Sequence, residues 1–213
     1  MKLRVLLIDD HAVVRDGLRT VLIASKRFQV EDEASTAREG IRKAIEQPFD
    51  AVVLDLSLPD MSGIEAVKQI REHRPRLPVI IFSMHADRES CLRALRAGAL
   101  GYVTKQSAAE EIVQAIQTVA VGRRYVSPSI ADHLFGAAIG GNADGAAPHE
   151  ALSDREFEVL CLIGSGATVT QIAERLCLSV KTVSTYRARL LEKLRLENNS
   201  QAIKYVVEHS LVR

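Results

Sequence analysis

Three aspartates and one lysine carry the clearest chemical signal in this sequence, because each stands where a short apolar run ends. Asp9 and Asp10 follow the first run, Asp55 follows the third, and Lys105 follows the fifth. Carboxylates that gather at one point repel each other unless a cation lies among them, and oxygen ligands of this kind suit Mg²⁺. A carboxylate beside that ion can attack phosphorus and form an acyl phosphate, while a nearby lysine neutralises the phosphoryl oxygens. The pattern predicts phosphoryl transfer to an aspartate.

These residues meet only if the apolar runs are strands of one sheet. The runs alternate with amphipathic, helical segments, and three of them are almost continuously apolar, which is typical of parallel strands buried on both faces. The alternation predicts an α/β doubly wound fold with a five-stranded parallel sheet, in which ligands bind at the carboxyl ends of the strands. The expected strands are Leu3–Ile8, Gln29–Ala34, Ala51–Leu54, Val79–Phe82 and Gly101–Val103.

Each of these polar residues, taken alone, has an ordinary alternative explanation. Asp10 could be the N-cap of the helix that follows it, and Asp55 could begin a turn. Ser83, at the end of the fourth expected strand, could cap a helix, and Lys105 could be a solvated surface residue. Their coincidence at strand ends favours a common site, in which Ser83 donates a hydrogen bond to a phosphoryl oxygen.

A second signal is a basic helix near the C-terminus. Between Ser179 and Arg195 there are five Lys or Arg residues and one acid, although the net charge of the whole chain is only +1. A short turn joins this helix to the preceding one, which is typical of a helix-turn-helix whose later helix enters the major groove of DNA. A basic amphipathic helix can also be a solvated surface, and the pattern alone leaves that alternative open. The inward face is Val183, Leu190, Leu191 and Leu194, and the outward face is Lys181, Ser184, Thr185 and Ala188.

Residues 1–122 resemble the receiver domains of two-component response regulators. The resemblance implies that Asp55 accepts a phosphoryl group from a sensor histidine kinase, and that Lys105 pairs with this group. It also implies that Ser83 and Tyr102 form a switch pair. Many receivers have proline after the lysine, whereas Gln106 stands here, so no cis bond is expected at that point. The implied Mg²⁺ ligands are Asp9, Asp10, Asp55 and the backbone carbonyl of Ser57. The motifs that carry the resemblance are Asp9-Asp10, Asp55 in Leu-Asp-Leu-Ser-Leu-Pro-Asp-Met-Ser-Gly, Ser83 in Ile-Phe-Ser, Gly98-Ala-Leu-Gly-Tyr102 and Lys105.

Residues 150–213 resemble the LuxR-type helix-turn-helix domain of NarL/FixJ regulators. Segments that carry the match include Leu152-Ser-Asp-Arg-Glu156, Leu178-Ser179 and Lys181-Thr182-Val183. The segment Thr168-Val-Thr-Gln171 lacks a basic residue that the family often has, which places a phosphate contact there in doubt. The implied base-reading positions, Ser184, Thr185 and Ala188, carry little charge, so either the sequence preference differs from that of the family or recognition depends more on DNA shape. The implied DNA-binding residues are Lys181, Thr182, Ser184, Thr185, Arg187, Ala188, Arg189 and Lys193.

The expected organisation is a receiver domain at 1–122, a short helix and flexible linker at 123–149, and a small four-helix, all-α domain at 150–213. The linker is inferred from small residues without periodicity in Gly136–His149. No apolar run reaches the roughly 18–20 residues that span a bilayer, and the N-terminal apolar run is too short for a signal peptide. We therefore expect a cytoplasmic protein without a membrane partner.

The combined interpretation is a transcription regulator controlled by phosphorylation, and not an enzyme acting on external substrates. Its expected partners are a sensor histidine kinase and double-stranded DNA, and it is expected to form a homodimer when phosphorylated or DNA-bound. The last expected helix offers a candidate dimer surface, or alternatively a part of the domain core, formed by Ala202, Ile203, Val206 and Val207. One alternative is an aspartyl-phosphate phosphatase, but Ser57 stands where such enzymes carry a second acid. Another is a DNA-binding protein that ignores phosphorylation.

Overall fold

A computed structural model describes residues 2–84, 87–107, 109–131, 147–209 and 211. It divides into two compact units, Met1–His133 and Leu134–Arg213, and each is described by itself. Residues 136–146 of the expected linker lie outside the described residues. The short helix expected within residues 123–149 is present. It includes residues 128–131 and begins directly after Ser127.

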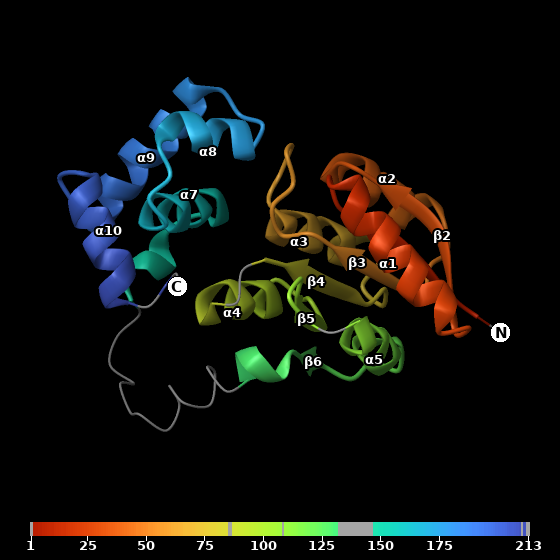
Figure 1. The fold of residues 1–213 in the computed structure, drawn as a ribbon. Coiled ribbons are helices and arrows are strands. Elements are labelled where there is room, and N and C mark those ends of the chain that lie inside the picture. The colour runs from red at the N-terminus through yellow and green to blue at the C-terminus, as the bar shows by residue number, and fades with distance from the viewer. Residues whose placement is uncertain (1, 85–86, 108, 132–146, 210, 212–213) are drawn as a thin grey trace. The chain divides into compact units, whose positions relative to one another are not determined.

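Among the described residues, six strands of the N-terminal unit form one parallel sheet in the order β2-β1-β3-β4-β5-β6 (Figure 1). The sheet therefore reverses its winding direction at β1, which places a crevice between the carboxyl ends of β1 and β3. The strands are β1 (Leu3–Ile8), β2 (Phe28–Ala34), β3 (Ala51–Leu54), β4 (Val79–Ser83), β5 (Gly101–Thr104) and β6 (Tyr125–Val126). The helices are α1 (Ala12–Ala24), α2 (Ala37–Glu46), α3 (Gly63–His73), α4 (Arg88–Arg96) and α5 (Ala109–Ala120).

The prediction of a five-stranded sheet was wrong by one strand. Tyr125 and Val126 pair with Gly101 and Tyr102 as a sixth, parallel strand. The Tyr125 N–H donates to the Leu100 carbonyl, and the Ser127 N–H donates to the Tyr102 carbonyl, both at 2.9 Å. A two-residue strand is too short to show any periodicity, so the sequence pattern gave no sign of it.

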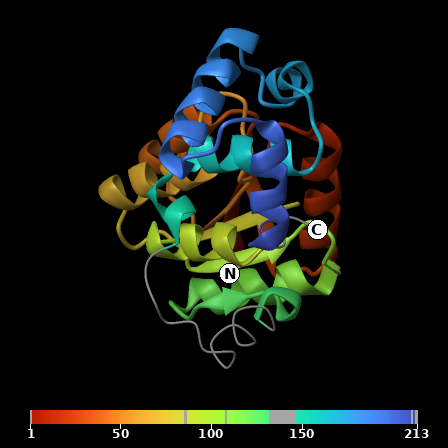
Figure 2. The ribbon, with the colours of Figure 1, turned by 90° about the vertical axis from the view of Figure 1, so that its left-hand side faces the viewer.

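Helices cover both faces of the sheet, as the apolar strands require. Figures 1 and 2 show α1 and α5 on one face and α2 and α3 on the other. On the first face, Leu18 and Leu22 of α1 and Ile116 of α5 pack against Val5 and Leu7 of β1. On the second face, Gly40 of α2 lies so close to Ile8 that no side chain fits between them. The sheet is thus held rigidly between two helical layers, and its strand ends form a fixed platform.

Within its described residues, the C-terminal unit is all helical. Ser153, Thr168 and Ser179 cap their helices through side-chain oxygens that accept backbone N–H groups. The unit has a short 3-10 turn, η1 (Pro148–Ala151), followed by α7 (Asp154–Gly164), α8 (Val169–Arg175), α9 (Val180–Leu194) and α10 (Asn199–Glu208). One apolar cluster joins these helices, with Phe157, Leu160, Ile172, Val183, Leu190 and Val206 among its members.

Candidate functional site

The carboxyl ends of β1, β3 and β5 bring Asp9, Asp55 and Lys105 to one place. Lys105 Nζ lies 2.7 Å from Asp9 Oδ2 and 2.8 Å from Asp55 Oδ2. Asp9 is 2% exposed and Asp55 is 4% exposed. Two buried carboxylates are costly without a compensating cation, so the lysine is an essential part of this cluster.

Asp10 completes the acidic cluster from the end of β1. One ligand atom from each of Asp9, Asp10, His11 and Asp55 lies within 4.8 Å of all the others. The alternative that Asp10 is the N-cap of α1 is wrong, because His11 holds the N-cap position and contributes no side-chain cap hydrogen bond. Asp10 is therefore free to contribute its carboxylate to the cluster.

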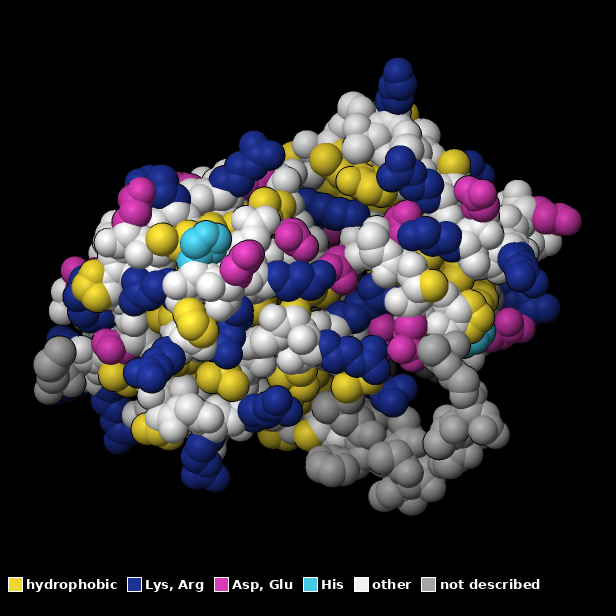
Figure 3. Space-filling model, turned by 180° about the vertical axis from the view of Figure 1, so that it is seen from behind, with side chains coloured by type: hydrophobic (Ala, Val, Ile, Leu, Met, Phe, Trp, Pro, Cys, Tyr) yellow, Lys and Arg dark blue, Asp and Glu magenta, His cyan; other side chains and the backbone are white. Residues whose placement is uncertain are grey.

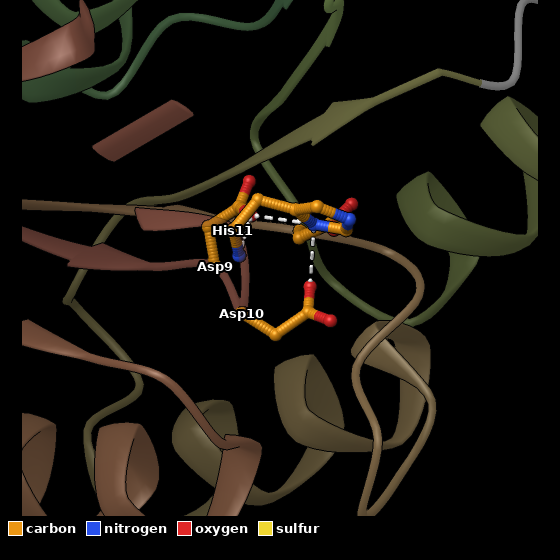
Figure 4. Close-up of side chains that lie close together, drawn as sticks. Asp9, Asp10 and His11 are labelled. Atoms are coloured by element: carbon orange, nitrogen blue, oxygen red, sulfur yellow. Dashed lines mark hydrogen bonds and ion pairs between the residues drawn. The ribbon is translucent and has the colours of Figure 1, made fainter. Parts of the chain in front are cut away.

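His11 is a member of the cluster that the sequence analysis missed. Its Nδ1 lies 2.8 Å from Asp10 Oδ1 and 3.3 Å from Asp9 Oδ1, and Figure 4 shows the ring turned towards both carboxylates. The His11 backbone N–H also donates to Asp9 Oδ1 at 2.9 Å. The signal for it in the sequence is its position directly after Asp9-Asp10.

Burial dominates the electrostatics of Asp55. Burial raises the pKa of its carboxyl group to about 6, with Lys105 opposing that rise and Asp9 adding to it. The pKa of the Lys105 ammonium is also raised, because its two carboxylate partners outweigh the opposite effect of burial. The cluster thus holds more negative charge than one lysine neutralises.

The donor atoms of the cluster fit Mg²⁺. Asp9 Oδ2 and Asp10 Oδ1 are buried, and they contact Lys105 Nζ at 2.7 Å and His11 Nδ1 at 2.8 Å, respectively. Buried carboxylate oxygens with unused lone pairs are suited to a hard divalent cation, which prefers oxygen ligands. Asp9, Asp10 and Asp55 would supply these oxygens.

Ser57 lies beside Asp55 in the loop between β3 and α3. Its backbone N–H donates to the Asp55 carboxylate, and it forms an isolated antiparallel bridge with Ser62. The next turn is closed by a 2.7 Å hydrogen bond from the Gly63 N–H to the Leu56 carbonyl. The loop therefore holds the acceptor residue in place through its backbone, and the Ser57 carbonyl as a metal ligand stays a prediction.

Ser83 and Tyr102 lie on neighbouring strands and are in contact. Tyr102 is fully buried and shares a side-chain hydrogen bond with Ser83. Burial raises the pKa of the Tyr102 phenol well above its usual value, and the negative charge of Asp87 adds to this. The phenol is therefore neutral and able to donate. The two residues implied as a switch pair are adjacent, with the aromatic ring in an inward position.

In the C-terminal unit, α8 and α9 form the expected helix-turn-helix. The turn contains Cys177 in the left-handed region, at φ 49°. The inward residues Val183 and Leu190 of α9 are fully buried. Ser184 and Thr185, on the exposed side, donate their hydroxyl protons to carbonyls of the same helix, which leaves their oxygens available as acceptors.

Two of the four basic residues in the implied DNA-binding set have side-chain partners within their own unit. Lys193 Nζ donates to Glu156 Oε2 at 2.6 Å, and Arg187 Nε donates to Asn199 Oδ1 at 2.5 Å. In contrast, the side chains of Lys181 and Arg189 are exposed and have no hydrogen-bond or ion-pair partner among the described residues. Lys181 and Arg189 are therefore better placed than Lys193 to contact phosphates, while their role stays a prediction.

We expect Lys181→Ala and Arg189→Ala each to flatten the dependence of log Kd for DNA on log salt concentration by about 0.9, since each removes one phosphate contact. Lys193→Ala should leave that slope unchanged. It should instead lower the free energy of unfolding by about 1–3 kcal/mol, because Glu156 loses its partner. Fluorescence anisotropy across a salt series and urea unfolding measure the two quantities. A reduced slope for Lys193→Ala would contradict this division.

The surface charge is mixed. On the face drawn in Figure 3, Lys and Arg side chains are spread among acidic and hydrophobic ones. This agrees with the net charge of +1, and it means that DNA binding must depend on local basic residues and not on the charge of the whole chain. In the described part of the chain, no helix combines the length and the apolar character needed to cross a membrane.

Fold and site together define a phosphoacceptor domain linked to a helix-turn-helix domain, and comparisons with known proteins agree. Residues 5–117 match the family "Response regulator receiver domain", and residues 150–206 match "Bacterial regulatory proteins, luxR family". The transcriptional regulatory protein LiaR of Bacillus subtilis is 38% identical over 210 residues, which cover 99% of both chains. The chain therefore belongs to the two-component response regulators with a LuxR-type DNA-binding domain.

Solved structures of similar proteins include RcsB of Salmonella enterica serovar Typhimurium, bound to a promoter in the presence of the phosphomimetic BeF3⁻. That structure is 28% identical, covers 97% of this chain and 98% of its own, and has a TM-score of 0.66. Another holds two RcsB dimers bound to two parallel DNAs, with 27% identity, full coverage of both chains and a TM-score of 0.61. Both matching families are families of regulatory proteins, and neither is a classical enzyme family.

Proposed function

We propose that this response regulator accepts a phosphoryl group on Asp55, and that phosphorylation controls its binding to DNA. The observation that carries the proposal is the contact of Lys105 with both Asp55 and Asp9 at 2.8 and 2.7 Å. A lysine so placed can neutralise a phosphoryl oxygen attached to Asp55. We propose that a sensor histidine kinase donates the phosphoryl group. The location of the protein in the cytoplasm stays a prediction.

The chemistry is a displacement at phosphorus. A carboxylate oxygen of Asp55 attacks the phosphorus, the bond from phosphorus to the donor nitrogen breaks, and the electron pair leaves with the donor. Lys105 stays charged throughout and neutralises the oxygens of the incoming phosphoryl group. Asp9, Asp10, Asp55 and the Ser57 carbonyl are the groups that would hold the metal ion. Mg²⁺, when bound, supplies further neutralisation of the phosphoryl oxygens. Loss of the phosphoryl group to water would be the only reaction this domain catalyses besides its own phosphorylation.

The response would pass from the phosphoryl group to Ser83 and Tyr102. We propose that the Ser83 hydroxyl donates to a phosphoryl oxygen and that the buried position of the Tyr102 ring belongs to that state. Phosphorylation would then shift an existing equilibrium between two arrangements of this pair. The RcsB structure bound to a promoter with BeF3⁻ and the RcsB dimers on DNA support the proposal that the phosphorylated form of this chain binds DNA as a dimer.

The test combines phosphorylation with DNA binding. The purified chain is incubated with a small acyl phosphate as donor and with Mg²⁺. The aspartyl phosphate that forms on the chain is then trapped by reduction, and tandem mass spectrometry locates the labelled residue. We expect the label on Asp55, no label above background in Asp55→Asn, and full labelling in Asp16→Asn, whose carboxylate is exposed on α1. Incubation with the phosphoryl donor should raise the affinity for DNA in the natural chain and in Asp16→Asn, but not in Asp55→Asn.

Two outcomes would contradict the proposal. Labelling of Asp55→Asn at the level of the natural chain would remove Asp55 as the acceptor. An affinity for DNA that does not respond to phosphorylation would favour a DNA-binding protein whose receiver only mediates contacts. Rapid turnover of an external phosphate ester would favour a phosphatase, although Ser57 offers no carboxylate for acid–base catalysis.

A further inference from the structure

We propose that His11 is a direct ligand of the metal ion held by Asp9, Asp10 and Asp55, and that its nitrogen makes the site favour a first-row transition metal such as Mn²⁺ over Mg²⁺. This inference rests on the metal site of the proposed function. It concerns the identity of the donor atoms and the resulting choice of metal, and not the phosphorylation of Asp55.

The positions of the donor atoms carry the inference. Around an ion with ligands at about 2.1 Å, adjacent octahedral ligands lie about 3 Å apart and opposite ligands about 4.2 Å apart. His11 Nδ1 lies 2.8 Å from Asp10 Oδ1 and 3.3 Å from Asp9 Oδ1, close to the adjacent spacing. The limit of 4.8 Å within which all four donors lie is close to the opposite spacing. One ion can therefore lie within reach of a donor atom from each of the four residues.

The backbone of His11 and the side chain of Lys105 fix the orientation of the Asp9 carboxylate. The His11 N–H donates to Asp9 Oδ1 at 2.9 Å, which holds the two side chains on the same side of the turn after β1. Lys105 lies against Asp9 Oδ2 and Asp55 Oδ2. Lys105 thus contacts Asp9 at Oδ2, whereas the His11 ring contacts it at Oδ1 (Figure 4).

A buried carboxylate oxygen provides a further indication of a ligand. Asp10 Oδ1 is buried without a hydrogen bond of acceptable geometry, and His11 Nδ1 lies 2.8 Å from it, whereas Asp9 Oδ2 is paired with Lys105. The His11 side chain is 65% exposed, so its Nε2 can carry the ring proton in water while Nδ1 offers its lone pair. A histidine that only packed against the domain would not require its ring nitrogen to face two acids.

An imidazole donor changes which metals the site prefers. Mg²⁺ prefers oxygen and gives up water reluctantly, so replacing a water by imidazole gains little for it. First-row transition ions bind imidazole more strongly, in an order in which Mn²⁺ is the weakest and Zn²⁺ and Cu²⁺ are stronger. Mn²⁺ is therefore a conservative probe, because any preference it shows is a lower bound for the later metals.

The experiment uses the full chain with metal alone and no phosphoryl donor. Mn²⁺ binding is followed by electron paramagnetic resonance, and Mg²⁺ by competition, in the natural chain and in His11→Phe, which keeps a ring without a donor nitrogen. We expect the preference for Mn²⁺ over Mg²⁺ to fall by about tenfold in His11→Phe. Electron spin echo modulation should show a ¹⁴N coupling in the natural chain and none in the variant.

His73→Phe is the matched control, because His73 is an exposed histidine on α3 whose Nδ1 contacts the carbonyl of Gln69. It should keep both the metal preference and the ¹⁴N coupling. His11→Ala tests whether the phenyl ring itself blocks the site, and it should behave as His11→Phe. Melting temperatures of all variants establish that they are folded.

The outcomes separate this inference from the proposed function. If the natural chain binds Mn²⁺ without a ¹⁴N coupling, or if His11→Phe and His11→Ala keep the natural preference, His11 is not a ligand and the phosphoacceptor site is unaffected. If the folded natural chain binds neither Mn²⁺ nor Mg²⁺, the metal site of the proposed function fails as well.

Discussion

Replacement of Lys105 by methionine is expected to slow phosphorylation by a small acyl phosphate about 100- to 1,000-fold and, at the same time, to tighten the binding of Mg²⁺. The first change follows because Lys105 is the cation nearest to the position of the transferring phosphoryl oxygens, and removal of one such donor has a cost of that size. The second follows because the acidic cluster would lose the charge that now competes with a metal ion.

The geometry explains why one substitution has two opposite effects. Lys105 contacts Asp9 and Asp55 simultaneously, and both carboxylates are almost completely buried. Without the ammonium group, the two carboxylates repel each other unless a divalent cation takes its place. The affinity of the site for Mg²⁺ therefore rises, because the ion now neutralises the carboxylates that Lys105 neutralised before. The transition state loses a hydrogen-bond donor that the metal ion does not replace.

The measurements are the rate of phosphorylation at saturating Mg²⁺ and the dissociation constant of Mg²⁺ in the absence of phosphoryl donor. Lys68→Met is the control, because Lys68 is an exposed residue of α3 in a loose 3.7 Å pair with Glu65. Both quantities should be unchanged in that variant. If Lys105→Met weakened Mg²⁺ binding and phosphorylation in parallel, its role would be to support the fold of the site and not to neutralise phosphoryl oxygens.

The main features of the site could be predicted from sequence because they depend on regular structure. Asp9, Asp55 and Lys105 are far apart in the chain, but each follows an apolar strand, and parallel strands present their carboxyl ends at one edge. The helix starts at Ser153, Thr168 and Ser179 were equally accessible, since an N-cap acts on backbone N–H groups only two or three residues away. In both cases a local pattern determines the position of the side chain.

The features that the sequence did not predict depend on side-chain direction or on very short elements. His11 contacts the acids through a ring orientation that no spacing rule specifies. The partners of Lys193 and Arg187 are Glu156 and Asn199, which lie on other helices. A helical periodicity predicts the face of the helix on which a residue lies. It does not predict how far the side chain extends or which atom it contacts.

The turn after Asp55 connects the fold of the domain directly to its acceptor residue. Gly63 begins α3, and a Cβ at this position would lie 2.3 Å from the Asp55 carbonyl oxygen and 2.7 Å from the Leu56 Cα. Both neighbours are backbone atoms, which cannot move aside as the end of a side chain can. The close approach of helix and strand is therefore possible only with glycine, and it places Asp55 next to the start of α3.

We accordingly expect Gly63→Ala to lower the free energy of unfolding of the N-terminal unit by about 3 kcal/mol, near the upper end of typical overpacking costs. Phosphorylation should be slowed even where the variant is folded, because the backbone of the acceptor residue must shift. Gly17→Ala is the control: a Cβ at Gly17 meets nothing within 4 Å, and this change within α1 should raise stability by up to about 1 kcal/mol. Urea unfolding and phosphorylation rates test both variants. A Gly63→Ala chain as stable and as readily phosphorylated as the natural one would mean that the loop after β3 can adapt, and that the backbone does not fix the position of Asp55.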